Sequence, residues 1–281
     1  MQNNDSTRRN FMKQMGVAVA TASVLRGKSF SNVNGVRPTV KVGAIGVGSR
    51  GRGAMRNIRD AADLLGVNIE FVAVADVNEI SVRRVGESFD VPEQHQFAGF
   101  DAYRKLLELP INVVLMATPP NFRPLHFEVA VDAGCHCFIE KPVAVDAPGA
   151  RRMYAVGNEA TQKGLSVVAG MQRRHMSRYA RNARAIRQGA IGRILGGKVM
   201  WLWSRPLWVR HRREGESNAQ YLARNWGNFV EMSGDHIVEQ HVHNLDIANW
   251  FIGQTLQAML HLCEIAVKHI LNQHVFKIQC T

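Results

Sequence analysis

The sequence predicts an α/β fold, in which a doubly wound parallel sheet is followed by an incomplete α/β domain. Short apolar runs rich in β-branched residues alternate with amphipathic segments of helical length from residue 40 to residue 170. Strands that alternate with helices in this way form parallel sheets covered on both faces. A glycine-rich turn also joins the first apolar run directly to the first helical segment.

Length and composition indicate a soluble globular protein with two domains. The chain has 281 residues, of which 46% are hydrophobic and 21% are charged, so it can bury a substantial core. Its 4 cysteines are too few for a disulfide scaffold, and their positions make no metal or redox motif. Every apolar run is shorter than the roughly 18 residues that a spanning helix needs, so we expect no stable membrane span.

The net charge of +12 is concentrated in one part of the chain. Twelve Lys and Arg and no acidic residue lie between Gln172 and Arg213, and they account for the whole excess. No helix-turn-helix, zinc-finger or RNA-binding aromatic motif accompanies them, so we expect no nucleic-acid partner. The patch is interpreted as a solvated helix face together with a basic lining for an acidic or phosphorylated ligand.

Residues 1–35 are predicted to be an export signal and a linker. Ser6-Thr7-Arg8-Arg9-Asn10-Phe11-Met12-Lys13 precedes a short, weakly apolar run, a pattern similar to the twin-arginine signal of bacteria. This signal implies the twin-arginine export machinery as a partner and a periplasmic location. An ordinary basic amphipathic N-terminus is the alternative interpretation.

The first strand, turn and helix are predicted to bind a dinucleotide. A strand over Val40–Ile45 is followed by Gly46-Val47-Gly48-Ser49-Arg50-Gly51, a helix to Leu65 and a second strand over Ile69–Ala75. Gly46 permits the tight turn, Gly48 lets the backbone approach the pyrophosphate, and Gly51 lets the helix pack closely on the strand. The helix N-terminus then faces the phosphates, so Ser49 and Arg50 are assigned to cofactor binding with the three glycines.

Residues 36–170 are therefore predicted to form an NAD(P)-binding Rossmann domain. Asp76 ends the second strand, 25 residues after Gly51, where its carboxylate can accept both ribose hydroxyls. A carboxylate there would repel a 2′-phosphate, which favours NAD over NADP. Arg83 and Arg84 lie close in sequence and keep NADP as an alternative.

Three further strands and three helices continue the alternation. Strands are predicted over Ile111–Ala117, Cys135–Ile139 and Leu165–Ala169, and helices over Asp101–Glu108, residues 122–133 and Ala147–Thr161. Asn121 is the expected N-cap of the second of these helices, and Gly134 ends it. Ligands bind beyond the carboxyl ends of parallel strands, where Thr118, Pro119 and Lys141 all fall.

Lys141 has the most specific predicted role of these residues. The proline that follows it holds it extended at the edge of the sheet. Its ammonium group can there hydrogen-bond a substrate oxygen and stabilise alkoxide character during hydride transfer. A surface lysine paired with the neighbouring Glu140 is the alternative.

These motifs, in this order and spacing, resemble those of one oxidoreductase family. The residues are Gly46-x-Gly48-x-x-Gly51, Ala117-Thr118-Pro119, Gly134 and Glu140-Lys141-Pro142. They are similar to motifs of the glucose–fructose oxidoreductase, inositol dehydrogenase and rhizopine-catabolism oxidoreductases (Gfo/Idh/MocA), over residues 40–253. The resemblance implies that Lys141 contacts substrate and nicotinamide, and that Thr118, Pro119 and Glu140 help to bind the cofactor. It also implies a sugar, polyol or sugar derivative as the substrate.

A second group of polar residues lies between residues 233 and 246. On a helix, Glu239, His243 and Asp246 share one face, whereas His236 and His241 point elsewhere. The stretch does not contain the His-Glu-x-x-His of a zinc protease, so no metal site is predicted. The resembled family has an acid four residues before a catalytic histidine and an aspartate three residues after it. The resemblance thus assigns His243 as general base, places Glu239 at the usual aspartate position, and has Asp246 orient the imidazole. A His-rich helix packed on the sheet is the alternative.

Residues 171–281 are predicted to form a partial domain for substrate binding and oligomerisation. Trp201, Trp203 and Trp208 lie in a β-leaning stretch that is either strand core or a wall for stacking a sugar. Residues 254–281 are predicted to form one or two helical pieces, too few for the open sheet with which the resembled family continues. We therefore expect a truncated chain or a divergent short form, and a lost sheet would weaken substrate binding and homo-oligomer formation.

The sequence thus predicts an oxidoreductase that transfers a hydride between NAD and a sugar, polyol or sugar derivative, with NADP as the alternative cofactor. Two other functions stay open. One is a truncated nucleotide-binding remnant without turnover. The other is an NAD-dependent glycosidase, which has a similar fold and would cleave a glycoside without net formation of NADH.

Overall fold

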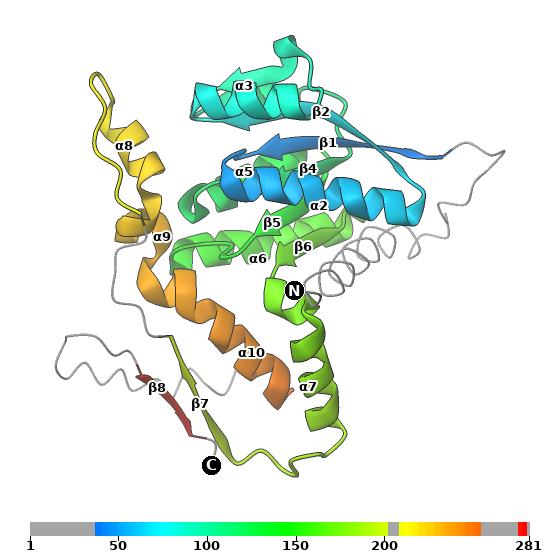
Figure 1. Cartoon of the computed structure of the whole chain (residues 1–281), viewed down its shortest axis with the longest axis vertical. Coiled ribbons are helices and arrows are strands. Elements are labelled where there is room, and N and C mark those ends of the chain that lie inside the picture. The colour runs from blue at the N-terminus through cyan, green and yellow to red at the C-terminus, as the bar shows by residue number, and fades with distance from the viewer. Residues whose placement is uncertain (1–36, 202–207, 254–274, 280–281) are drawn as a thin grey trace, which may run out of the picture.

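The computed structural model describes residues 37–201, 208–253 and 275–279, and its centre is a six-stranded sheet (Figure 1). The strands lie in the order β3-β2-β1-β4-β5-β6, and every neighbouring pair is parallel. In chain order they are β1 (Thr39–Ile45), β2 (Asn68–Asp76), β3 (Gln96–Ala98), β4 (Val113–Met116), β5 (His136–Glu140) and β6 (Val167–Gly170). The predicted doubly wound parallel sheet is therefore confirmed.

Helices cover both faces of this sheet. They are α2 (Ser49–Leu65), α3 (Glu79–Ser88), α4 (Ala102–Leu107), α5 (Arg123–Asp132) and α6 (Ala147–Gln162), with a short turn η2 (Glu93–His95) before β3. Met55 and Ile58 of α2 and Val82 of α3 form one core with the sheet, and helices α4 to α6 form the other. Within the described ranges, none of the helices is both long enough and apolar enough to cross a membrane.

The direction of the chain through the sheet reverses between β1 and β4. From β1 the chain moves outward to β2 and β3, whereas from β4 it moves outward to β5 and β6 on the other side. The crossover connections diverge at this point, and in such sheets the gap beyond the strands' carboxyl ends is where ligands bind.

The start of helix α5 differs from the prediction. A 3₁₀ turn, η3 (Pro120–Phe122), precedes the helix, and Phe122 rather than Asn121 is its N-cap. The two consecutive prolines before Asn121 fix their own φ angles and begin the turn early. The Asn121 amide instead donates to the sulfur of Met232, 3.1 Å away in the second part of the chain.

The chain after β6 forms a second, smaller group of elements. They are η4 (Gln172–His175), α7 (Ser177–Arg187), β7 (Gly196–Met200), α8 (Asn218–Arg224), η5 (Trp226–Asn228), α9 (Val230–Ser233), the π-helical turn η6 (Ile237–His241), α10 (Val242–Ile252) and β8 (Val275–Gln279). Strands β7 and β8 pair in antiparallel fashion, with Gly196 opposite Gln279 and Met200 opposite Val275.

The helical prediction for the last residues is wrong at 275–279, which form strand β8. The sequence Val-Phe-Lys-Ile-Gln is rich in β-branched and aromatic residues, and its pairing with β7 outweighs a weak helical periodicity. The Arg8-Arg9 motif, Trp203 and the rest of the predicted helical tail (254–274) lie outside the described residues.

Candidate active site

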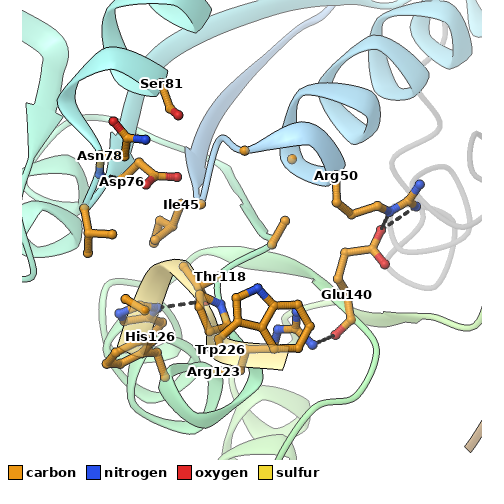
Figure 2. A pocket seen from close by; sticks show the side chains of 18 of the residues that line it. Ile45, Arg50, Asp76, Asn78, Ser81, Thr118, Arg123, His126, Glu140 and Trp226 are labelled. Atoms are coloured by element: carbon orange, nitrogen blue, oxygen red, sulfur yellow. Dashed lines mark hydrogen bonds and ion pairs between the residues drawn. The ribbon is translucent and has the colours of Figure 1, made fainter. Parts of the chain in front are cut away.

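A cavity of about 570 Å³ lies at the carboxyl-terminal edge of the sheet (Figure 2). Its walls come from the ends of β1, β2, β4 and β5, from the turn before α2, and from residues of η6 and α10. Every residue that the sequence analysis assigns to the site lines this cavity, with the exception of Asp246. These residues are Gly46, Gly48, Ser49, Arg50, Gly51, Asp76, Thr118, Pro119, Glu140, Lys141, Glu239 and His243.

The three glycines of the turn have different surroundings. Gly46 has a φ of +84°, and a Cβ there would lie 2.5 Å from the backbone nitrogen of Thr118. A Cβ on Gly51 would lie only 1.9 Å from the carbonyl oxygen of Gly46. A Cβ on Gly48 would meet nothing within 4 Å, because this residue faces the cavity. The turn thus offers an open cradle at Gly48, next to the N-terminus of α2, which suits the pyrophosphate of a dinucleotide.

Asp76 connects the end of β2 to this turn. Its carboxylate accepts hydrogen bonds from the backbone N–H groups of Val47, at 2.8 Å, and Asn78, at 2.9 Å. Burial raises the pKa of Asp76, while these backbone hydrogen bonds act in the opposite direction. Each carboxylate oxygen has a second lone pair, so the predicted contact with ribose hydroxyls is compatible with this arrangement.

Two arginines hold Glu140 and the segment after it. Arg50 Nε donates to Glu140 Oε1 at 2.7 Å, and Arg123 Nη1 donates to the backbone oxygen of Glu140 at 2.9 Å (Figure 2). Arg123 also donates to the backbone oxygen of Pro142. Burial lowers the pKa of Arg123 to about 10, which still leaves it charged at neutral pH. Sequence reasoning missed Arg123. Its one signal was its position shortly after two prolines at the end of a strand, and that position does not indicate a function.

Lys141 pairs with Glu239, from the other part of the chain, and not with its neighbour Glu140. Its Nζ donates to Glu239 Oε1 at 2.7 Å and to the backbone oxygen of Glu239. Burial lowers the pKa of Lys141 and raises that of Glu239, whereas the ion pair favours the charged form of each. Glu239 Oε2 is buried and has no hydrogen-bond partner among the described residues. The longer side chain of a glutamate at this position thus reaches the lysine.

His243 follows the π-helical turn η6 at the start of α10, and π-turns inside helices are frequent at functional sites. The imidazole is buried, lines the cavity and stacks on Trp201 with a ring-centroid distance of 5.8 Å. Burial lowers the pKa of His243 to about 4, and the positive charges of Lys141 and Arg173 act in the same direction. At neutral pH the ring is therefore uncharged and able to accept a proton.

Asp246 lies elsewhere, contrary to its predicted role. Its two carboxylate oxygens accept hydrogen bonds from Nε of Arg174, at 2.8 and 2.9 Å. On α10 the side chain of Asp246 faces η4, where a guanidinium is available, whereas His243 faces the cavity. Asp246 thus docks α10 on η4, and the ring contact of the imidazole is with Trp201.

The other two histidines of this stretch lie away from the cavity lining. The rings of His236 and His241 contact each other edge to face, with a centroid distance of 4.9 Å. In the described part of the chain, no group of three His, Cys, Asp or Glu residues is placed to hold a metal ion.

A segment that sequence reasoning did not assign to the site forms another wall of the cavity. We call it the arch (residues 208–228), and its cavity-lining residues are Trp208, Arg210, Ala223, Arg224 and Trp226. The rings of Trp208 and Trp226 meet edge to face, with a centroid distance of 5.5 Å. Trp208 was considered as a sugar-stacking residue, but neither Trp226 nor the two arginines carried a recognisable motif.

Known proteins resemble this chain in sequence and in fold. Residues 40–169 match the Gfo/Idh/MocA family, described as "Oxidoreductase family, NAD-binding Rossmann fold". The chain is 27% identical to the inositol 2-dehydrogenase/D-chiro-inositol 3-dehydrogenase of Shouchella clausii, over 83% of this chain and 59% of that protein. It is 28% identical to a glycosyl hydrolase family 109 protein of Shewanella pealeana, over 58% of this chain and 35% of the relative. A scyllo-inositol dehydrogenase from Lactobacillus casei, solved with NAD(H) and scyllo-inositol, has a similar fold, with a TM-score of 0.57, 21% identity, and coverage of 76% of this chain and 56% of that one.

The sheet order and the glycine turn define an NAD-binding Rossmann domain. The match to the Gfo/Idh/MocA oxidoreductase family covers this domain, residues 40–169, and the relatives of the chain include inositol and other sugar dehydrogenases. The chain spans about half the length of the curated relatives that it matches.

Proposed function

We propose that the protein oxidises a CH–OH group of a sugar, a polyol or a sugar derivative, with NAD as the hydride acceptor. The observation that carries this proposal is the position of an uncharged, buried His243 beside the Lys141–Glu239 ion pair, in the same cavity as the glycine turn. The inositol dehydrogenase relative supports the choice of substrate class.

Lys141 and His243 have different roles in the proposed reaction. Lys141 uses two of its N–H groups on Glu239, so its third can donate to the hydroxyl oxygen that is oxidised. His243 accepts the proton of that hydroxyl, and the carbonyl double bond forms as the carbon loses its hydride. NAD, when bound in the cavity, would accept this hydride.

A substrate screen tests this function directly. Wild-type protein is mixed with NAD and a panel of sugars and inositols, and NADH formation is followed by absorbance. We expect at least one member of the panel to be oxidised. Protein that binds NAD but oxidises nothing in a broad panel would favour the nucleotide-binding remnant.

The glycosyl hydrolase relative makes a second reaction worth testing in the same screen. An enzyme of that kind oxidises its sugar transiently and reduces it again, so it releases a cleaved glycoside without net NADH. Chromogenic glycosides therefore accompany the free sugars. Cleavage that requires NAD, without accumulation of NADH, would replace the dehydrogenase assignment with a glycosidase.

The acid limb of the pH profile should report the protonation of His243. Since burial and two cations disfavour the imidazolium, the base-competent form dominates above a pKa of about 4, and kcat/KM should fall only as the pH drops through that value. Replacing Arg173 with glutamine removes one of these cations, so the limb should move to higher pH. Arg178→Gln, on the neighbouring helix α7, is the charge-matched control and should leave the limb in place. A wild-type limb near 6.5, unmoved by Arg173→Gln, would contradict the assignment of His243 as base.

We also propose that the protein is exported through the twin-arginine route to the periplasm. The support is the Arg8-Arg9 motif before a weakly apolar run. Replacing both arginines with lysine should retain the protein in the cytoplasm, as measured by cell fractionation and immunoblotting. Equal periplasmic recovery of the variant and the wild type would remove this proposal.

A further inference from the structure

Arg123 holds the backbone on both sides of Lys141. It is the first residue of α5, and its Nη1 donates to the carbonyl oxygen of Glu140 at 2.9 Å (Figure 2). The same nitrogen donates to the carbonyl oxygen of Pro142. Lys141 is the one residue between Glu140 and Pro142. A single nitrogen of the guanidinium therefore bridges the carbonyl groups before and after the lysine.

This bridge lies where the sheet no longer holds the chain. The pairing of β5 with β6 ends at Glu140, which lies opposite Gly170, and Lys141 follows directly. The ammonium group of Lys141 is anchored on Glu239 of η6, in the other part of the chain. Arg123 therefore continues the support of the backbone beyond the end of the ladder.

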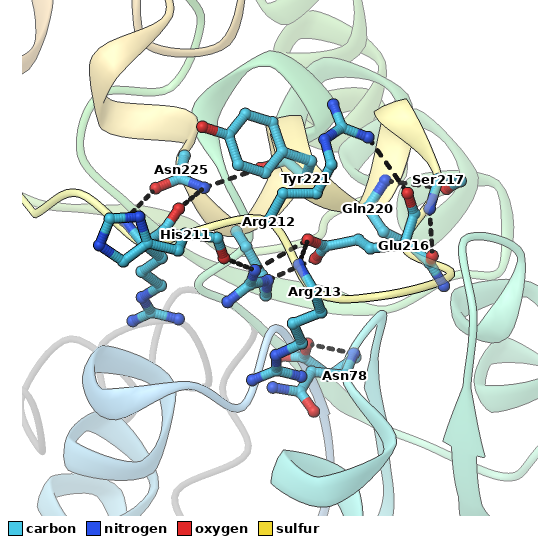
Figure 3. A network of polar contacts seen from close by, with 12 residues as sticks. Asn78, His211, Arg212, Arg213, Glu216, Ser217, Gln220, Tyr221 and Asn225 are labelled. Carbon is cyan, nitrogen blue, oxygen red and sulfur yellow. Dashed lines mark hydrogen bonds and ion pairs between the residues drawn. The ribbon is translucent and has the colours of Figure 1, made fainter.

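Stability alone does not favour a charged group at this place. Arg123 is only 4% exposed, and its hydrogen-bond acceptors among the described residues are backbone oxygens. Arg224, another arginine of the cavity lining, instead donates at 2.5 Å to a carboxylate, that of Glu216 of the arch (Figure 3). Burial of a charged group costs free energy, and apolar side chains of similar volume are often at least as stabilising. The contacts of Arg123 thus indicate a role in placing the chain at the cavity.

We propose that Arg123 is the positioning residue of Lys141, and that its bridge keeps the ammonium group where it meets the reacting hydroxyl. Arg123 then acts through Lys141 and needs no contact with the substrate. Such a role has a large effect, because a displacement of about 1 Å at a reacting centre can cost about 100-fold in rate. This inference rests on the proposed function for its effect on turnover, whereas the hold on Lys141 can be measured without any substrate.

The charge of Arg123 also acts on the ammonium group. Burial lowers the pKa of Lys141, and the nearby charge of Arg123 acts in the same direction. The carboxylates of Glu239 and Glu140 oppose this shift, and the imidazole of His243, in the same cavity, is uncharged at neutral pH. Loss of Arg123 should therefore raise the pKa of Lys141 toward its ordinary value, because one cation and part of the burial are removed.

Chemical labelling of the full chain tests this hold in the absence of substrate. Acetic anhydride acetylates only the neutral amine, so the pH dependence of Lys141 acetylation, followed by mass spectrometry, reports its pKa. The rate at high pH reports its accessibility. In Arg123→Met, which removes the charge and the donors at similar volume, we expect a higher pKa and faster labelling at high pH. Arg152→Gln is the control, because it removes an exposed guanidinium whose ion-pair partner, Glu128, also lies on α5, and it should leave both values unchanged.

A double-mutant cycle tests the effect on the reaction, with a substrate from the screen. Arg123→Met should lower kcat by about 10- to 100-fold and leave the affinity for NADH unchanged. In the Lys141→Ala background the same change should have little further effect, because the residue through which it acts is gone. Arg123→Lys keeps a cation, but its side chain is one bond shorter and lacks the planar guanidinium, so it should recover only part of the loss.

Three results would contradict this role. The first is identical Lys141 labelling in the wild type and in Arg123→Met, with a cooperative thermal unfolding curve that shows the variant to be folded. The second is full additivity of the losses in the cycle. The third is wild-type kcat in Arg123→Lys, which would show that a cation alone suffices.

Arg123→Lys also decides the matter if Arg123→Met does not fold. Faster labelling of Lys141 at high pH than in the wild type would then support the bridge, and equal labelling would contradict it. The expected change in labelling, together with no turnover of any substrate in the screen, would contradict only the proposed function.

Discussion

Replacing His243 with alanine is expected to lower the turnover of a sugar or polyol by about 10² to 10⁴. Hydride can leave the carbon only as its hydroxyl loses a proton, and His243 is the uncharged base that the structure places at the cavity. Affinity for NAD should stay the same, because the glycine turn lies at the start of α2 and does not contact this side chain. The measurement is steady-state NADH formation beside a direct NAD titration.

Variants of the two other residues refine this result. Lys141→Ala should cause a loss as severe as that of His243→Ala, because it removes the N–H that faces the reacting oxygen. Glu239→Ala should have an intermediate effect, since it removes the partner of Lys141 but leaves the ammonium group in place. Full activity of His243→Ala with an active wild type would show that the base is another group.

Replacing Gly48 with valine is expected to reduce NAD binding by roughly 100-fold or more, the combined effect of two or more lost phosphate contacts. The fold should survive, because Gly48 has a φ of −63°, which any residue can adopt, and an added Cβ meets nothing within 4 Å. The side chain would instead fill the cradle that the pyrophosphate needs. Titration with NADH and a thermal unfolding curve measure the two effects independently.

Two other glycines of helix α2 provide the controls for this experiment. Gly53→Val adds the same side chain where a Cβ also meets nothing within 4 Å, but outside the cavity lining, so binding should be normal. Gly51→Ala should unfold the turn itself, because its Cβ would lie 1.9 Å from a backbone oxygen. If Gly48→Val binds NADH as tightly as Gly53→Val, the glycine turn is not the phosphate site.

The sequence was most informative where chemistry and backbone geometry coincide. Gly46 and Gly51 have backbone neighbours too close for a Cβ, whereas Gly48 leaves the phosphate cradle open, so the spacing of the three glycines predicted the turn and the strand and helix around it. The role of Lys141 was predicted from its position at the end of a strand and directly before a proline. Because the carboxyl ends of parallel strands lie at one edge of the sheet, the predicted strands were enough to place these residues near one another.

Contacts between distant segments were the part that the sequence could not predict. The helical spacing placed Asp246 beside His243, but Arg174 of η4 lies close enough to take its carboxylate. The arch had no signal of its own, because the arginines of a basic stretch look alike until the fold selects Arg210 for the cavity. The strand at 275–279 depends on β7, whose residues lie about 80 positions earlier.

Of the tryptophans that the structure describes, Trp208 and Trp226 line the cavity, whereas Trp201 and Trp250 do not. The ring centroids of Trp208 and Trp226 lie 5.5 Å apart, in the cavity that the glycine turn also lines. Displacement of water from these rings shifts their emission, and a reduced nicotinamide nearby can take up their excitation energy. Cofactor binding should therefore change the intrinsic tryptophan fluorescence of the protein. A fluorescence titration without any label can then follow binding and release of the cofactor in real time.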